Sequence, residues 1–306
     1  MKCSLCSRGG VVELRYYKQS LCKRHFKELF ERRVRKTIRM SRMFGPNDRI
    51  VVGLSGGKDS SVLLFLLHQI FEHNPRVEVI PVTIDEGILA VSGRLKATRK
   101  LCGMLGLEHK VYSLKERLGF TVDEAVRKIK DGAGACSYCG VWRRRVLNDV
   151  ARELSADKVA IGHNLDDEIQ AAFMNLVRGD LDRMARLGPV VGVMSHERFV
   201  PRVKPLRDVP ESEVLAYAKL SGILFSSFKC PYSGESFRTT VRKMLDGLEE
   251  RHPGSKFQML QSMDNLIAVM KEKVKAEGET IRCCVSCGEP TSQEKCKTCV
   301  ILEKLK

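Results

Sequence analysis

The sequence predicts an α/β fold in which a doubly wound parallel sheet carries a small zinc-binding unit at each end of the chain. Apolar segments of strand length alternate with segments of helical periodicity from residue 49 to residue 220. A glycine-rich turn at residues 55–60 joins the first strand to the first helix of this series, and Cys-x2-Cys pairs stand near both termini. Strands separated by helices form parallel sheets, and paired cysteine knuckles hold zinc. These three observations predict the fold class.

The N-terminal unit, residues 1–26, is predicted from four metal ligands, Cys3, Cys6, Cys22 and His25. They form two close pairs separated by fifteen residues, a segment long enough for a small hairpin. Each pair can take one edge of a zinc tetrahedron, and no coordination position is left open for chemistry. The pattern indicates a structural zinc finger.

A basic linker helix is expected at residues 27–47. Apolar residues recur at helical spacing at Phe26, Phe30, Val34 and Ile38. The other face carries the cations Lys27, Arg32, Arg33, Arg35, Lys36, Arg39 and Arg42, and glutamates at helical spacing partner few of them. A contact with an RNA backbone and a merely solvated face both fit this pattern.

The main domain is expected at residues 48–232. Its predicted strands cover residues 49–54, 77–84, 108–113 and 157–162, and its predicted helices cover residues 59–73, 92–106, 122–130, 167–178 and 211–220. Ligands of doubly wound sheets bind beyond the carboxyl ends of the strands. Four candidate sites occupy such positions: the Ser55 loop, Ile84-Asp85, the pair Cys136/Cys139, and Gly162-His163.

The turn after the first strand is the predicted anion site, and it reads Gly53, Leu54, Ser55, Gly56, Gly57, Lys58, Asp59, Ser60. Its glycines let the backbone approach a phosphate, and the first helical N–H groups point at that phosphate. The serines add hydroxyl donors, and Lys58 adds a mobile charge. The spacing differs from a Walker A loop, because three residues separate Gly53 from Gly57 and Asp59 follows the lysine. A turn that only connects strand and helix is the plain alternative.

A second motif, Gly162-His163-Asn164-Leu165-Asp166-Asp167, closes the last predicted strand and opens a helix. Adjacent carboxylates beside a phosphate loop suit Mg²⁺ bound between ATP oxygens. The alternative is that Asp166 or Asp167 only caps the helix.

A third group of cysteines lies between and after these motifs. Cys136 and Cys139 precede a helix expected to begin at Gly140, where a helix N-terminus and three nearby arginines should lower the thiol pKa. Cys230 is the predicted partner of this pair. Three thiolates without a fourth protein ligand can hold a [4Fe–4S] cluster with one open iron. A disulfide or persulfide relay is the runner-up, and a merely structural Cys230 is a third possibility. Cys102 is expected in the core.

The C-terminal part is expected to hold helices at residues 235–251 and 256–275, within a unit spanning residues 233–280. A zinc ribbon follows at residues 281–306, with the ligands Cys284, Cys287, Cys296 and Cys299. Cys283 is an alternative first ligand, but two-residue spacing favours Cys284. The basic segment from Asn175 to Pro189 is a further candidate RNA contact.

Composition indicates a polyanionic partner and no membrane. The chain has 306 residues and carries 53 basic against 37 acidic residues, a formal net charge of +16. Nucleic acid is the leading partner for such a balance, and solubility is the plain alternative. The longest apolar run has six residues, 62–67, far below a membrane span, and the first residues do not resemble a signal peptide. We therefore expect a cytoplasmic protein.

Several of these motifs resemble a known family. Ser-Gly-Gly-Lys-Asp-Ser resembles the signature of the PP-loop ATP pyrophosphatases, and Gly-His-x-x-Asp-Asp resembles the second ATP-site motif of their tRNA-modifying members. The whole series of metal motifs resembles the tRNA 2-thiolation enzymes with flanking zinc fingers. The segments Cys-Ser-Tyr-Cys-Gly-Val-Trp-Arg-Arg, Asn-Leu-Val-Arg-Gly-Asp and Cys-Lys-Thr-Cys-Val-Ile-Leu-Glu most resemble the cytosolic wobble-uridine thiolases of archaea and eukaryotes. The subgroup that thiolates the T-loop uridine shares the metal motifs.

The resemblance implies an ATP-dependent tRNA sulfurtransferase. ATP would bind at residues 53–60, with its base near Ile84 and Gly162. The C2 oxygen of a uridine would attack the α-phosphate, and sulfide held on the cluster would then displace AMP. The resemblance implies catalytic roles for Lys58, Asp59, Cys139, Cys230 and Asp166, and nucleotide contacts from His163 and Asp167.

The resemblance also implies partners for the reaction. In the family, sulfur comes from a ubiquitin-like carrier protein or from free sulfide, and related enzymes form homodimers or heterodimers. Two rival functions remain at this stage. One is a lysidine-type or amidating PP-loop enzyme, which has no use for three additional thiolates. The other is a non-catalytic zinc-finger RNA-binding protein, which has no use for intact acidic motifs.

Overall fold

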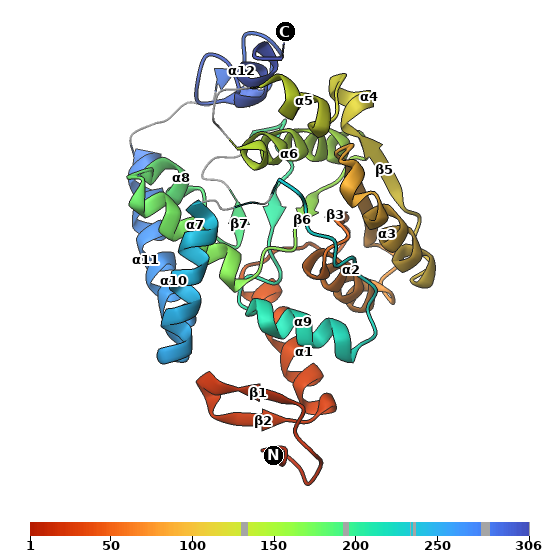
Figure 1. Ribbon diagram of the computed structural model, residues 1–306, viewed down its shortest axis with the longest axis vertical. Coiled ribbons are helices and arrows are strands. Elements are labelled where there is room, and N and C mark those ends of the chain that lie inside the picture. The colour runs from red at the N-terminus through yellow and green to blue at the C-terminus, as the bar shows by residue number, and fades with distance from the viewer. Residues whose placement is uncertain (130–133, 192–195, 233, 235–236, 277–281, 306) are drawn as a thin grey trace.

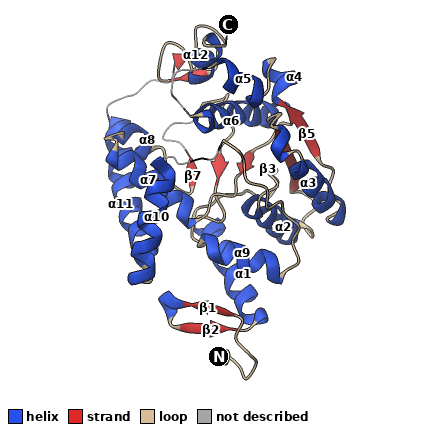
Figure 2. Ribbon diagram, in the orientation of Figure 1, coloured by secondary structure: helices blue, strands red, loops and turns tan. Residues whose placement is uncertain are grey.

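A six-stranded sheet lies at the centre of the computed structural model, which describes residues 1–129, 134–191, 196–232, 234, 237–276 and 282–305 (Figures 1 and 2). The strand order is β5-β4-β3-β6-β8-β7. The strands are β3 (Arg49–Gly53), β4 (Glu78–Asp85), β5 (Lys110–Ser113), β6 (Lys158–Ala160), β7 (Val190–Val191) and β8 (Arg202–Val203). All adjacent pairs are parallel except β7 with β8. The predicted doubly wound parallel sheet is confirmed, with one antiparallel strand at its edge.

Successive side chains of β3 point to opposite faces of the sheet, and a layer of helices covers each face. Ile50 and Val52 point into one core, formed with α1 (Lys23–Met40), α2 (Lys58–Phe71) and α9 (Glu211–Leu220). Val51 points to the opposite side, where α4 (Leu114–Leu118), α5 (Val122–Lys128) and α6 (Ala135–Glu153) form a second core. The first strand of the sheet thus has neighbours on both sides, β4 and β6. Such a switch point opens a crevice at the carboxyl ends of the strands.

Three long helices and one short helix form a third group at one side of the sheet (Figure 1). They are α7 (Leu165–Val177), α8 (Leu181–Ala185), α10 (Phe237–Arg251) and α11 (Ser255–Ala276), while α3 (Gly93–Met104) lies beside β4 and β5. Leu165, Ile169, Val241, Leu245 and Leu260 form a separate apolar core between α7, α10 and α11. The predicted C-terminal helices are confirmed, although the expected start at Glu235 lies outside the described residues. None of the described helices combines the length and apolarity that a bilayer crossing requires.

The two cysteine-rich units lie at opposite ends of the longest axis (Figure 1). The N-terminal unit contains the hairpin β1 (Val12–Leu14) and β2 (Gln19–Leu21). The C-terminal unit contains β9 (Arg282–Cys283), β10 (Pro290–Thr291) and α12 (Lys297–Glu303), and it lies against α6. Its Ile301 is buried in the core under α6. Both units are therefore attached to the layers that surround the sheet.

The helix α1 has the predicted apolar stripe. Phe26, Phe30 and Val34 are fully buried, and Phe30 stacks on Tyr217 of α9 with 4.2 Å between ring centroids. The prediction that Arg33 belongs to the solvated basic face is wrong. Its guanidinium lies 3.0 Å from the Glu213 carboxylate in a largely buried ion pair. Arg33 lies on the boundary of the apolar stripe, where α1 meets α9.

Candidate functional site

The glycine-rich loop is built as an anion site at the carboxyl end of β3. Gly56 has a φ of +80°, and a Cβ atom there would lie 3.2 Å from side-chain atoms of Arg94 and Thr98, so both conformation and space require glycine. The Ser60 hydroxyl accepts a hydrogen bond from the Ser55 N–H at 3.2 Å and donates to the Gly57 carbonyl at 3.1 Å. The loop is thereby held against the first turn of α2. The first N–H groups of that helix have no acceptor within it and point at the loop.

Lys58 and Asp59 form part of a charged network above the loop. The Lys58 ammonium lies 2.9 Å from the Asp59 carboxylate and 2.6 Å from the Glu211 carboxylate. Burial alone would lower the pKa of Lys58, but these two carboxylates raise it. Glu211 is a site residue that the sequence did not reveal, because an acidic residue after Pro210 reads only as the first turn of a helix. Its position at the start of α9 brings it to Lys58.

A small cavity of about 100 Å³ opens beside the loop at the carboxyl end of β4. Ser55, Thr83, Ile84, Glu86 and Arg94 are among its lining residues. The Thr83 hydroxyl donates to the Leu54 carbonyl at 2.7 Å, which ties β4 to the loop. Two of the predicted sites, the Ser55 loop and Ile84-Asp85, are therefore adjacent in space.

The second predicted motif lies against the same loop from the side of β6. A Cβ atom on Gly162 would lie 2.9 Å from the Asp59 carbonyl carbon and from the Ser60 nitrogen, so only glycine permits this approach. The Asn164 amide donates to the Asp59 carboxylate at 3.0 Å. His163 is half-exposed, with its ring 3.7 Å from Glu168.

The two adjacent carboxylates of this motif have protein partners. Asp167 forms a capping box with Asn164 at the start of α7, as the helix-cap alternative predicts, and Arg238 lies 3.3 Å from it. Asp166 is buried, accepts from the Glu211 N–H at 2.7 Å and binds the Lys256 ammonium. A Mg²⁺ ion would have to displace these donors from Asp166 and Asp167. The magnesium assignment stays a prediction, and no chemical step below depends on it.

The third group of cysteines meets at the start of α6. Cys136 and Cys139 lie in its first turns, and the Cys136 thiol donates to the Tyr232 carbonyl at 3.1 Å, two residues after Cys230. Cys139 and Cys230 pack against the same core. The sulfur atoms of the three residues do not all lie within 4.8 Å of one another, in contrast to the two terminal groups. The three cysteines are therefore not arranged as ligands of a single ion, and the cluster assignment stays a prediction.

Two expectations about this group are wrong. The helix begins at Ala135, not at Gly140, because Tyr138 and Trp142 stack one turn apart and are buried against the sheet. The thiol pKa is not lowered: burial raises the pKa of Cys139 to about 11 despite the nearby Arg143, and burial also raises the pKa of Cys136. Cys102 lies in the core as expected.

The cysteine group and the phosphate loop share one side of the molecule. The Ser226 N–H donates to the Gly56 carbonyl at 2.8 Å. Cys230 lies only four positions after Ser226, so the chain can span at most about 14 Å between them. From the other direction, Arg143 lies 3.2 Å from Glu86, which lines the cavity beside the loop. The structure thus brings together the loop, the Gly162 motif and the three cysteines.

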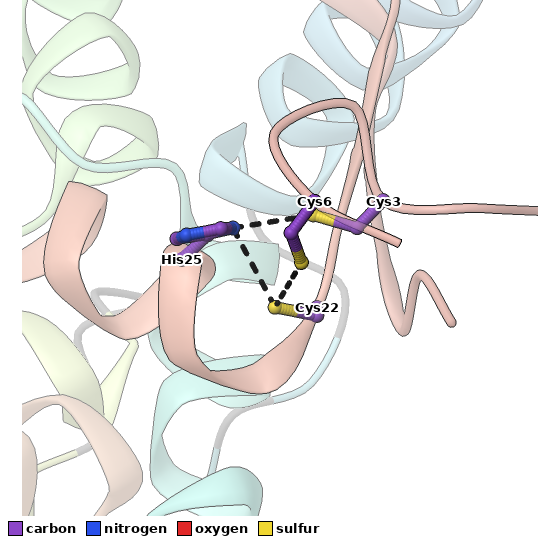
Figure 3. A group of neighbouring side chains, drawn as sticks. All are labelled: Cys3, Cys6, Cys22 and His25. Carbon is purple, nitrogen blue, oxygen red and sulfur yellow. Dashed lines mark hydrogen bonds between the residues drawn. The ribbon is translucent and has the colours of Figure 1, made fainter. Parts of the chain in front are cut away.

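The two terminal cysteine groups fit single tetrahedral ions. Cys3, Cys6, Cys22 and His25 converge with all ligand atoms within 4.8 Å of one another (Figure 3). The Cys6 and Cys22 sulfurs are 3.8 Å apart, and those of Cys287 and Cys296 are 3.6 Å apart. Four thiolates about 2.3 Å from a zinc ion would lie about 3.8 Å from one another. Cys284, not Cys283, completes the C-terminal group with Cys287, Cys296 and Cys299, as predicted.

Comparisons with known proteins agree with this arrangement. A family profile described as a PP-loop domain matches residues 23–247. The tRNA 2-thiolation protein NcsA of Haloferax volcanii is 37% identical over 100% of this chain and 99% of its own length. The tRNA-5-methyluridine(54) 2-sulfurtransferase of Pyrococcus horikoshii is 32% identical over 98% of this chain and 93% of its own. A solved structure, the U34-tRNA thiolase NcsA from Methanococcus maripaludis with its [4Fe–4S] cluster, superimposes with a TM-score of 0.79 at 37% identity and covers 88% of both chains.

Proposed function

Because the chain belongs to the PP-loop family of tRNA 2-thiolation proteins, we propose that it replaces the C2 oxygen of the wobble uridine of tRNA with sulfur. The observation that carries this proposal is the placement of Cys136, Cys139 and Cys230 beside the phosphate loop. A phosphate loop alone activates an oxygen, and it needs a sulfur source nearby to become a thiolase. The wobble position is favoured over the T-loop position because the relative named as a U34-tRNA thiolase is 37% identical, against 32% for the methyluridine-54 enzyme.

The first step is adenylation of the uridine. The C2 oxygen attacks the α-phosphorus of ATP, the bond to the leaving phosphate breaks, and pyrophosphate departs. Lys58 and the first N–H groups of α2 stabilise the negative charge on the phosphates. Lys58 must turn away from Glu211 to reach them, and Gly162 holds the first turn of α2 in place.

The second step forms the carbon–sulfur bond. Sulfide adds at C2 of the adenylated uridine, the C2–O bond breaks, and AMP leaves with the original oxygen. Cys136, Cys139 and Cys230 would hold a [4Fe–4S] cluster, which would supply an iron without a protein ligand for binding sulfide. Cys139 is partly buried, and the nearby Arg143 balances thiolate charge at this position.

The remaining assignments complete the proposal. The two terminal groups hold structural zinc ions, because their ligand spacing fits one tetrahedral ion each. The sulfur comes from a ubiquitin-like carrier or from free sulfide, and supplying each alone in the assay distinguishes the two. The enzyme acts in the cytoplasm, as a homodimer or as a heterodimer with a related subunit, and light scattering of the purified protein tests for the homodimer.

The test is thiolation of an unmodified tRNA transcript by the anaerobically reconstituted enzyme, with 2-thiouridine mapped by mass spectrometry. We expect thiolation at the wobble position. Cys139→Ser should abolish thiolation while ATP still binds, and Asp59→Ala should lose pyrophosphate release while iron and zinc contents stay normal. Cys283→Ser removes an exposed cysteine outside every ligand group and should be neutral. Full activity of Cys139→Ser, or an amine-containing product, would overturn the proposal.

A further inference from the structure

An arginine cluster lies beside the site, with members on α6, β8, α8 and α10 whose charges act on Arg144. Arg143, Arg183 and Arg238 have acidic partners, namely Glu86, Asp180 and Asp167. Arg144 and Arg202 make no ion pair within the part of the chain that the structure describes. Arg144 is exposed and Arg202 is half-buried. The cluster therefore holds two guanidinium groups whose charge no carboxylate of the described residues balances.

The strand register shows which way Arg202 points. Val159 of β6 is paired with Arg202 of β8, and Ala160 with Val203. Paired residues of neighbouring strands face the same side of a sheet. Val159 is packed into the core under α6, whereas Ala160 and Val203 belong to the core on the opposite side. Arg202 therefore points toward the α6 layer.

The helix contacts place Arg144 at the carboxyl end of the sheet. Leu147 of α6 would lie 3.2 Å from a Cβ atom on Gly53, the last residue of β3. Arg144 precedes Leu147 by nearly one turn toward the start of α6, the end that carries Cys136 and Cys139. Its guanidinium would lie 3.3 Å from a Cβ atom on Gly140, so it extends back along the helix toward the cysteine group.

The cluster is unfavourable without a counterion. Burial among neighbouring atoms, followed by the charges of Arg202, Arg143, Arg183 and Arg238, lowers the pKa of Arg144 to about 10, although the side chain as a whole is exposed. Burial also lowers the pKa of Arg202. Both lowered pKa values mean that the charged form of the arginine is disfavoured. An arginine nevertheless keeps its proton near neutral pH. An anion bound by the two guanidinium groups would stabilise the charged form of both arginines.

We propose that Arg144 and Arg202 bind a backbone phosphate of the RNA substrate next to the uridine that is modified. This inference rests on the proposed function. The guanidinium group matches phosphate oxygens with paired N–H donors, and such contacts fix the register of a bound nucleic acid.

The strand order favours RNA over ATP as the source of the phosphate. The ATP-binding loop follows β3, and its adjoining cavity lies toward β4. Arg202 lies on β8, two strands from β3 in the opposite direction, or about 10 Å at the usual strand spacing. The uridine must reach between the ATP phosphates and the cysteine group. Its flanking phosphates then lie on the β8 side.

The test measures binding of an unmodified tRNA transcript to the reconstituted enzyme over a series of salt concentrations. Arg144→Met and Arg202→Met should each weaken binding about tenfold, and the double variant should reduce the slope of log K against log salt by about one. Arg144→Lys and Arg202→Lys should retain most of the affinity. ATP affinity should not change. The thermal midpoint should stay or rise, because each methionine replaces an unpaired charge.

Arg76→Met is the matched control, because Arg76 is exposed at the opposite end of the sheet, before β4. It should leave the tRNA affinity within twofold of wild type. Loss of ATP affinity with normal tRNA affinity in Arg144→Met and Arg202→Met would assign the cluster to nucleotide phosphates and overturn the proposal. Normal binding of both would show that the cluster has neither role. If the wild-type enzyme bound no tRNA, the proposed function itself would fail.

Discussion

Gly162 follows β6 and lies against the phosphate loop. The loop can take this position only because residue 162 has no side chain. In Gly162→Ala the new Cβ would meet backbone atoms of Asp59 and Ser60 at 2.9 Å, so the first turn of α2 must move. We expect ATP affinity to fall about tenfold and the free energy of unfolding to fall by about 1–3 kcal/mol. Calorimetric titration with a non-hydrolysable ATP analogue and urea unfolding measure the two effects.

The matched control for that variant is Gly103→Ala in α3. A Cβ atom on Gly103 would meet no atom within 4 Å, so the substitution should raise the free energy of unfolding by about 0.5–1 kcal/mol and leave ATP affinity alone. If Gly162→Ala bound the analogue as tightly as wild type, the close approach of β6 would not position the loop.

The protonation state of His109 can affect the phosphate loop, because His109 and the loop are both hydrogen-bonded to Thr83. The Thr83 hydroxyl donates to the Leu54 carbonyl, so it must accept from the His109 ring, whose Nε2 lies 2.8 Å away. The Nδ1 atom of His109 is buried without a partner among the described residues. Burial, with Arg99 nearby, lowers the pKa of His109. The neutral ring is therefore the form that the folded state requires.

The sign of the resulting pH dependence follows from this direction. Above the unfolded pKa of about 6.5, neither state is protonated and the full stability is present. As the pH falls below it, the unfolded chain binds a proton that the folded chain refuses, and stability falls by up to about 1.4 kcal/mol per pH unit. His109→Gln keeps a donor for Thr83 and should lack this slope in urea unfolding between pH 7.5 and 5. His73→Gln alters a fully exposed ring and should retain the wild-type slope. Equal slopes in all three proteins would contradict the prediction.

For the helices and strands, hydrophobic periodicity and the positions of proline and glycine were sufficient to predict most of the fold. The helix α9 begins at Glu211 and ends at Leu220 as expected, because Pro210 precedes it and Gly222 follows it. The strand β7 has two residues and no periodicity to detect. The start of α6 depends on packing of Tyr138 and Trp142 against the sheet, which no local pattern encodes.

The residues of the candidate site likewise divide into those that the sequence could predict and those that it could not. The terminal metal ligands could be predicted because close spacing in sequence imposes close spacing in space. The loop and the Gly162 motif were visible because glycine has a specific backbone use. Partners such as Glu211 for Lys58 could not be predicted, because 153 positions separate them and only the topology of the sheet brings them together.

The C-terminal cysteine-rich unit, where we propose a zinc ribbon, supports α6. Arg145 donates to the Cys287 sulfur at 3.3 Å, and Arg152 lies 2.9 Å from the buried Glu289. In Cys287→Ser the ribbon should lose its ion and detach, and exposing Ile301 alone costs about 2 kcal/mol. We expect a lower thermal midpoint and weaker tRNA binding, with the single-turnover rate at saturating tRNA within about threefold of wild type.

Cys283→Ser is the control, because Cys283 is adjacent but exposed and outside the ligand group. It should keep the zinc content, the thermal midpoint and the tRNA affinity of wild type. Loss of the single-turnover rate in Cys287→Ser at an unchanged thermal midpoint would show that the ribbon takes part in the chemistry.

For the whole molecule, the effect of the net charge of +16 on RNA binding depends on where the cations lie. The two cysteine-rich units lie at opposite ends of the longest axis, and the central sheet lies between them (Figure 1). The helix α1 connects the N-terminal unit to the sheet, and its outer face holds exposed cations at Arg32, Arg35, Lys36 and Arg39. These side chains make no ion pair with any described residue. A tRNA bound along this axis would meet α1 on its way to the crevice.

Replacing those four cations of α1 with glutamine should therefore weaken tRNA binding without altering ATP affinity. Each phosphate contact contributes about 0.9 to the salt slope, so the slope should fall by about two to four. Arg33→Gln on the same helix is the contrasting control. Its loss leaves Glu213 buried without a cation, which should cost about 3–5 kcal/mol of stability and leave the salt slope unchanged. A slope that fell for Arg33→Gln but not for the quadruple variant would mean that RNA does not approach along α1.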